Sequence, residues 1–135
     1  MSTETAASLK NEIDERAPQI IEHVNGFAKQ HFEIITKTRD GKKQFVDLVE
    51  AASQACCIDE FKLYIKYKGA KEGTRKLWGN LANPFNEKID ELMRTVANEI
   101  AEGNDTETVK LEVLRRFCGY LMWRTHADIS ERGGR

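Results

Sequence analysis

The sequence predicts an all-α protein, a compact five-helix bundle that forms a single domain. Apolar residues recur at spacings of three and four along several segments, which is the pattern of amphipathic helices. Alternating apolar and polar runs bounded by hairpin turns, the usual signal of strands, are nearly absent. Two prolines and nine glycines in 135 residues leave few interruptions, so the helices can be long.

The first long helix is predicted to begin near Pro18, because proline fits the first turn of a helix, and to continue to Ile35. A turn over residues 38–41 should follow it, with Gly41 free to adopt a positive φ. The apolar stripe of this helix consists of Ile20, Val24, Phe27, His31 and Ile34.

Two further helices are predicted in the middle of the chain. Asp59 is expected to be the N-cap of the second, which should fade near Gly69 or Gly73. Residues 77–82 are predicted to form a short helical turn or a structured loop. The apolar face of the first helix consists of Phe45, Leu48, Val49, Ala52 and Cys56, and that of the second consists of Phe61, Tyr64 and Ile65.

The pair Asn83-Pro84 is the strongest helix start signal in the chain, since it places a capping residue before a proline. The helix that follows should end at Gly103, and Asp105 or Thr106 should cap the last helix. Apolar residues surround much of the last helix. It is therefore predicted to lie at the centre and to contact several neighbours.

Both ends of the chain are predicted to be less ordered than the bundle. Residues 1–16 are expected to form a weakly ordered or kinked N-terminal helix. Residues 128–135 are expected to form a flexible tail, because chain ends fray unless they are tied down.

The composition indicates a soluble, cytoplasmic protein. Hydrophobic residues make up 40% of the chain and charged residues 32%, as in ordinary globular domains. No apolar run approaches the roughly 18 residues that a membrane span needs, and the first residues lack the features of a secretory signal. The cysteines, Cys56, Cys57 and Cys118, are odd in number and suggest no disulfide framework.

Motifs for catalysis, metal binding or cofactor binding are not found, so we expect a protein that is not an enzyme. The sequence contains no nucleophile elbow, no phosphate-binding glycine loop and no paired ligands at metal-site spacing. Arg16 and His23 have a spacing that resembles the Arg-x(4–6)-His pair of helical HEPN ribonucleases. Pro18 lies between them and makes the geometry of such a pair unfavourable.

Basic and aromatic residues form the most distinctive cluster, although the net charge is only −1. Lys62 and Lys66 are four residues apart on one helix face, where like charges repel unless an outside anion relieves them. Lysines would bind backbone phosphates without reading sequence, and Tyr64 and Tyr67 could stack on bases. An ordinary solvated helix face with half-buried tyrosines is the other interpretation. The remaining basic residues of this cluster are Lys68, Lys71, Arg75 and Lys76.

Two more basic groups could extend this surface if the fold brings them to one side. One occupies the turn after the first helix, and the other lies on the last helix beside Tyr120 and Trp123. Acidic residues such as Glu87, Asp90 and Glu91 would then lie elsewhere. The two groups are Lys37, Arg39, Lys42 and Lys43 in the turn, and Lys110, Arg115, Arg116, Arg124 and His126 on the last helix.

Two stretches, FKLYIKYKGAK at 61–71 and FCGYLMWR at 117–124, resemble the small helical subunit of type III CRISPR effector complexes. The resemblance implies a non-catalytic five-helix bundle in antiviral defence, whose copies stack within a ribonucleoprotein beside other protein subunits. It also implies contacts to the phosphates of the guide–target RNA duplex, with sequence read by base pairing. The positions that match are Lys62, Lys66, Lys71, Arg115, Arg116 and Arg124.

The candidate nucleic-acid-binding residues are thus Lys62, Lys66, Lys68, Lys71, Arg75, Arg115, Arg116 and Arg124. One feature departs from the resemblance: the chain is not net basic, so RNA binding without neighbouring subunits could be poor. The competing interpretation is a helical protein–protein adaptor or self-assembling module with no role in nucleic-acid binding.

Overall fold

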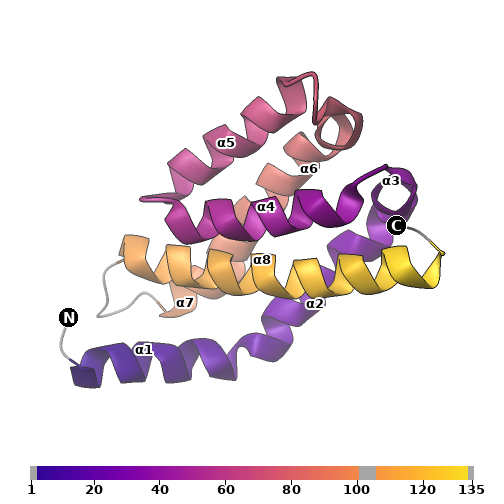
Figure 1. Cartoon of the computed structure of the whole chain (residues 1–135). Helices are drawn as coiled ribbons and strands as arrows, with labels where there is room; N and C mark the ends of the chain where they lie inside the picture. The colour runs from indigo at the N-terminus through magenta and orange to yellow at the C-terminus, as the bar shows by residue number, and fades with distance from the viewer. Residues whose placement is uncertain (1–2, 101–105, 134–135) are drawn as a thin grey trace.

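Helices account for almost all of the computed structural model, which describes residues 3–100 and 106–133 (Figure 1). This part of the chain contains no strand and folds as one domain, which confirms the predicted all-α class. The predicted count of five helices is wrong, because the described residues form seven when the continuous segment α6–η1–α7 is counted once. The elements are α1 (Thr3–Glu15), α2 (Ala17–Gln30), α3 (Phe32–Lys37), α4 (Gly41–Gln54), α5 (Ile58–Ala70), α6 (Arg75–Leu92), the π-helix η1 (Met93–Ala97), α7 (Asn98–Ile100) and α8 (Thr106–Glu131).

The two additional helices come from the N-terminal third. Residues 1–16 were expected to form a weakly ordered or kinked N-terminal helix. Helix α1 packs Leu9 and Ile13 into the core, at 4% and 3% exposure, and the chain leaves helical geometry at Arg16. The predicted helix from Pro18 to Ile35 divides at His31, which leaves helical geometry with φ −111° and ψ 21°. Apolar spacing continues across this break, so periodicity alone could not reveal it.

The turn between α3 and α4 differs from the prediction in one residue. Asp40, and not Gly41, adopts the left-handed conformation, with φ 62°. Gly41 begins α4 at a close approach, where a Cβ atom would lie 3.1 Å from the carbonyl oxygen of Ile35 and 3.1 Å from Cδ1 of Ile129. Glycine is needed here for space and not for its backbone freedom.

The link between α4 and α5 also corrects the sequence prediction. Helix α4 ends at Gln54, so Cys56 lies in the connection and is exposed instead of contributing to an apolar face. Cys57 is the residue before α5, and Asp59 lies in the first turn of α5 and is not its N-cap.

Pro84 lies inside α6 and does not start a helix there. The apolar stripe begins two turns earlier and runs without a change of spacing through Leu77, Trp78 and Leu81 to Phe85, all of them buried. An internal proline costs roughly 3 kcal/mol, whereas burying each large apolar side chain contributes about 1.5–3 kcal/mol. Burial therefore outweighs the hydrogen bond that Pro84 cannot donate. Residues 77–82, predicted to form a short helical turn or a structured loop, are part of this longer helix.

The end of the α6 segment widens into one π-helical turn, η1. A π turn contains one residue more than an α turn, and Met93, Val96 and Ala97 are all buried within it. The Thr95 hydroxyl donates to the carbonyl oxygen of Glu91 at 2.9 Å, which fills part of the widened turn. Helix α7 is described over Asn98–Ile100, and the predicted stop at Gly103 and cap candidate Asp105 fall outside the described residues. The other cap candidate, Thr106, is the first described residue of α8.

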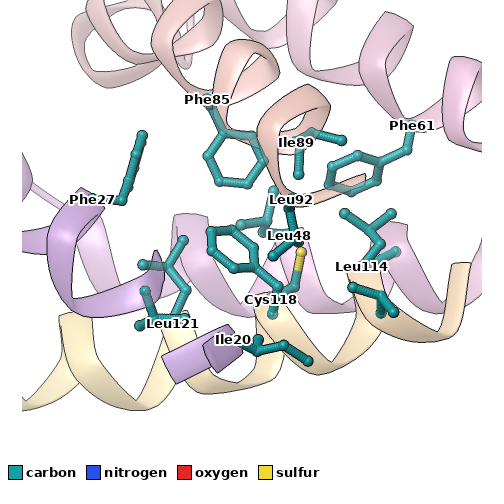
Figure 2. Packing of buried hydrophobic residues seen from close by; sticks show 14 of the residues in the cluster. Ile20, Phe27, Leu48, Phe61, Phe85, Ile89, Leu92, Leu114, Cys118 and Leu121 are labelled. Carbon is teal, nitrogen blue, oxygen red and sulfur yellow. The ribbon is translucent and has the colours of Figure 1, made fainter. Parts of the chain in front are cut away.

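Helix α8 is the structural centre, as predicted. It contacts α1, α2, α3, α4, α5, α7 and η1, and in Figure 1 it crosses the middle of the molecule between α4 and α1. Figure 2 shows Leu114, Cys118 and Leu121 of α8 facing side chains of α6. The flexible tail expected over 128–135 is instead helical to Glu131, and Asp128 and Ile129 are buried.

Candidate nucleic-acid interface

The first basic residue of α5, Lys62, is paired within the fold. Its ammonium lies 2.6 Å from Oδ1 of Asp90 on α6, and the amide of Asn86 donates to its backbone carbonyl oxygen at 3.1 Å. The acidic residues of α6 were expected to lie away from the basic cluster. Asp90 contradicts this expectation, because it pairs with Lys62. The repulsion predicted between Lys62 and Lys66 is already relieved by Asp90.

Lys68 is buried, at 4% exposure, although it was expected among the surface cations. Its ammonium donates to the hydroxyl of Tyr64 at 3.3 Å and lies 5.4 Å from the centre of the Tyr64 ring and 5.9 Å from that of Trp78. Burial lowers the pKa of Lys68 below its usual value. The aromatic rings stabilise this charge in part, because a cation is attracted to the face of a ring.

Three predicted residues, Lys66, Lys71 and Arg75, remain exposed and form no ion pair with another described residue. The ammonium of Lys71 lies 5.9 Å from the centre of the Tyr67 ring. Tyr67 is itself 57% exposed, so it presents aromatic surface next to a cation. This combination is typical of surfaces that bind single-stranded nucleic acid.

Arg115 on α8 forms hydrogen bonds to the C-terminal end of α4. Its guanidinium donates to the carbonyl oxygens of Ala52, Ser53 and Ala55 at 3.0, 3.3 and 3.4 Å, and to Glu112 at 2.7 Å. The last carbonyl groups of an α-helix have no partner within the helix, so this arginine completes the C-terminus of α4. Arg115 thus has a role inside the fold.

The other arginines of α8 are also engaged by neighbouring helices. Arg116 lies 2.9 Å from Oδ1 of Asp14 on α1. Arg124 contacts the buried Asp128 at 3.0 Å and the side-chain oxygen of Asn25 on α2 at 2.9 Å. These arginines hold α8 against α1 and α2, and their charges are largely neutralised.

Replacing Arg115 with glutamine should lower the free energy of unfolding by about 1–3 kcal/mol, since three carbonyl groups lose a charged donor. Urea denaturation of the purified chain measures this loss. Lys110→Gln is the matched control on the same helix, and it should change stability by less than about 0.5 kcal/mol. Equal stability of the two variants would show that the cap contributes nothing.

Two of the three basic groups do meet, at one end of the bundle. In Figure 1 the end of α5 and the start of α6 lie above the turn between α3 and α4. Two hollows with common walls lie there, of about 560 and 430 Å³, and both are lined by Asp40, Gln44, Gly73 and Thr74. We call their cations the basic corner: Arg39, Lys43, Lys68, Lys71 and Lys76.

The charges around the basic corner do not balance. Five cations line the two hollows, against the carboxylates of Asp40, Asp47 and Glu72. Lys43 lies 3.5 Å from Asp47, whereas Arg39, Lys71 and Lys76 have no ion-pair partner among the residues that the structure describes. The arginines of α8 line neither hollow, so the third basic group does not join the other two.

Some members of this site could not be found from the sequence. Gln44 lines both hollows, and its buried Oε1 has no hydrogen-bond partner in the described part of the chain. The hydroxyl of Thr74 donates to the carbonyl oxygen of Lys68 at 2.6 Å, which fixes the α5–α6 connection beside the hollows. Neither residue type signals a site by itself, and only the folded chain brings them together.

The pair Arg16 and His23, which resembles a ribonuclease motif, has partners within the fold. Arg16 is ion-paired to Glu99. The ring of His23 lies 3.2 Å from the hydroxyl of Thr95 and 3.4 Å from the ammonium of Lys88, and burial followed by the Lys88 charge lowers its pKa. Both side chains thus stabilise the contact of α2 with α6, η1 and α7.

Neither a metal site nor a membrane span is found in the described part of the chain. Residues 3–100 and 106–133 hold no group of three histidine, cysteine, aspartate or glutamate side chains arranged to bind a metal ion. Within the same residues, none of the helices combines the length and apolar character needed to cross a bilayer.

Comparison of the chain with protein-family models, with curated proteins and with solved structures found no match.

Proposed function

We propose that this chain binds the sugar–phosphate backbone of RNA without reading its sequence, as a non-catalytic cytoplasmic subunit of an RNA-guided CRISPR ribonucleoprotein. The observation that carries the proposal is the basic corner, where cations from the α3–α4 turn, α4, α5 and α6 surround two adjoining hollows. Arg39, Lys71 and Lys76, which form no ion pair with a described residue, are available to displace counterions from phosphates, which is the main source of sequence-independent affinity. The resemblance of residues 61–71 and 117–124 supports the CRISPR assignment.

The proposed interface is narrower than the one derived from the sequence. It keeps Lys66, Lys68, Lys71 and Arg75, and it gains Arg39, Lys43 and Lys76. Lys62 and the arginines of α8 are not part of the proposed interface, because they already pair with carboxylates or carbonyl groups within the fold. Exposed Tyr67 adds a ring on which an unpaired base can stack.

The test is a double variant, Lys71→Gln with Lys76→Gln, measured by fluorescence anisotropy against two unrelated single-stranded RNAs. Affinity should fall equally for both sequences, and the slope of log affinity against log salt should flatten by about 0.7 for each phosphate that the variant no longer neutralises. Both residues are exposed, so folding should be preserved. Because the chain is nearly neutral overall, the assay should be repeated on the assembled ribonucleoprotein.

Lys29→Gln with Arg94→Gln is the matched control, since it removes the same charge from exposed positions on α2 and η1. This variant should retain the parent's affinity and salt slope. If both double variants bind RNA as the parent does at every salt concentration, the basic corner is an ordinary solvated surface and the proposal fails.

A helical adaptor is the second candidate, and exposed apolar side chains favour it. Trp123 on α8 and Leu63 on α5 are each 67% exposed, and Trp123 borders a hollow of about 290 Å³ with Arg116, Gly119 and Tyr120. Aromatic residues are common anchors of protein interfaces. Under this candidate function, Trp123→Ala would weaken capture of partner subunits, while the basic-corner variant would not change RNA retention.

A further inference from the structure

The smaller hollow of the basic corner, between α4 and α5, contains a buried charge that forms no ion pair with any described residue. Lys68 lines this hollow of about 430 Å³ and is 96% buried. Its ammonium has three donors, yet the only hydrogen bond that it forms among the described residues runs to the hydroxyl of Tyr64. No described carboxylate lies within 4.0 Å of it. A buried charge in this state is costly unless another group compensates it.

The neighbouring charges make the hollow suitable for an anion. Lys43 and Lys71 line it together with Lys68, and Asp40 and Asp47 are its carboxylates. Asp47 lies 3.5 Å from Lys43, so this pair is close to neutral. The other lining carboxylate, Asp40, is exposed to solvent, and Asp47 is shared between Lys43 and the more distant Lys68. The remaining charge of the hollow is positive.

We infer that this hollow binds one phosphate group, with the Lys68 ammonium as the charge at its base and Lys71 at its rim. A phosphate group suits this arrangement, because its oxygens can accept hydrogen bonds from Lys68 and Lys71 at the same time. The volume lies in the range of small-ligand sites, and exposed Tyr67 on its wall is placed to contact an attached nucleoside. The inference deepens the proposed function and rests on it for the source of the phosphate, which is the RNA backbone.

Titration of the isotopically labelled full chain with inorganic phosphate, followed by NMR, tests the site directly. The backbone amides of Gln44, Lys68 and Thr74 should shift together and saturate. Lys68→Met keeps a long apolar side chain between the Tyr64 and Trp78 rings and removes the charge. It should weaken phosphate binding by at least about tenfold, as loss of a charged hydrogen bond does.

Asp47→Asn separates a binding role of Lys68 from a structural one. Removing this carboxylate takes a negative charge out of the hollow, so phosphate should bind about two- to fivefold more tightly. If Asp47 were simply the counterion of Lys68, this variant would lose stability and show no gain in phosphate affinity. That result, or the absence of saturable shifts in the parent chain, would overturn the inference.

A second titration uses a single-stranded RNA without terminal phosphates and identifies the source of the phosphate. We expect this RNA to compete with inorganic phosphate. We also expect Lys68→Met to weaken the binding of both ligands. If phosphate binds saturably and RNA does not compete with it, the site exists but binds a free phosphate compound. The proposed function would then lose this support. RNA binding that Lys68→Met leaves unchanged, with no phosphate shifts, would overturn the site while the proposed function survives.

Discussion

Replacing Phe85 with alanine should lower the free energy of unfolding by about 3–5 kcal/mol, the range found when large aromatic residues are removed from protein cores. Phe85 is fully buried on α6, and its ring lies 5.5 Å from that of Phe27, 5.4 Å from Trp78 and 6.0 Å from Phe117, measured between ring centres. Figure 2 shows it pointing into the space that α2, α6 and α8 enclose. One substitution therefore removes packing against α2 and α8 and against Trp78 of α6 itself.

Urea denaturation followed by circular dichroism measures this loss. Tyr67→Ala is a suitable comparison, because it removes an exposed aromatic side chain from a helix and should change stability by less than about 0.5 kcal/mol. Similar values for the two variants would mean that the aromatic cluster is not the core.

Leu121→Ala should lower the free energy of unfolding by about 2–5 kcal/mol, as is usual for a buried leucine. Leu121 is completely buried on α8, in the middle of the helix that contacts most of the others. Leu63→Ala makes the same chemical change at a position that is 67% exposed. The difference between the two variants in denaturant midpoint isolates the effect of burial. A loss below about 1 kcal/mol for Leu121→Ala would show that α8 is not the centre of the fold.

The fold class could be predicted from the sequence because apolar periodicity depends only on neighbouring residues. The apolar residues that surround much of the last helix also predicted the central position of α8. Periodicity failed where local signals compete with tertiary packing: the pair Asn83-Pro84 resembles a helix start, but burial of Trp78 and Leu81 extends α6 through it. It also failed at His31, where the chain changes direction without interrupting the apolar stripe.

The candidate site was less predictable, because a basic residue does not reveal its partner. Lys62 and Lys66 look equivalent in sequence, yet one is paired with Asp90 and the other is exposed without an ion pair among the described residues. One signal was available: Phe61, Ile65 and Lys68 are spaced by four and three, so Lys68 lies on the buried stripe of α5. The approach of the α3–α4 turn to the end of α5 involves residues about thirty positions apart and has no local signature.

The π-helical turn at Met93–Ala97 has a consequence for the register of the chain. A π turn is equivalent to one residue inserted into an α-helix, and each α-helical residue rotates the following side chains by about 100°. Ile100, three residues after η1, is 3% exposed in this register. If the same residues formed an unbroken α-helix, the extra residue would turn Ile100 away from the core by about 100°. Deleting a single residue between Met93 and Ala97 would instead convert the wide turn into an ordinary α turn and leave Ile100 facing the core. A homologous chain that is one residue shorter at this point would therefore need no π turn and could keep the same apolar positions in α7.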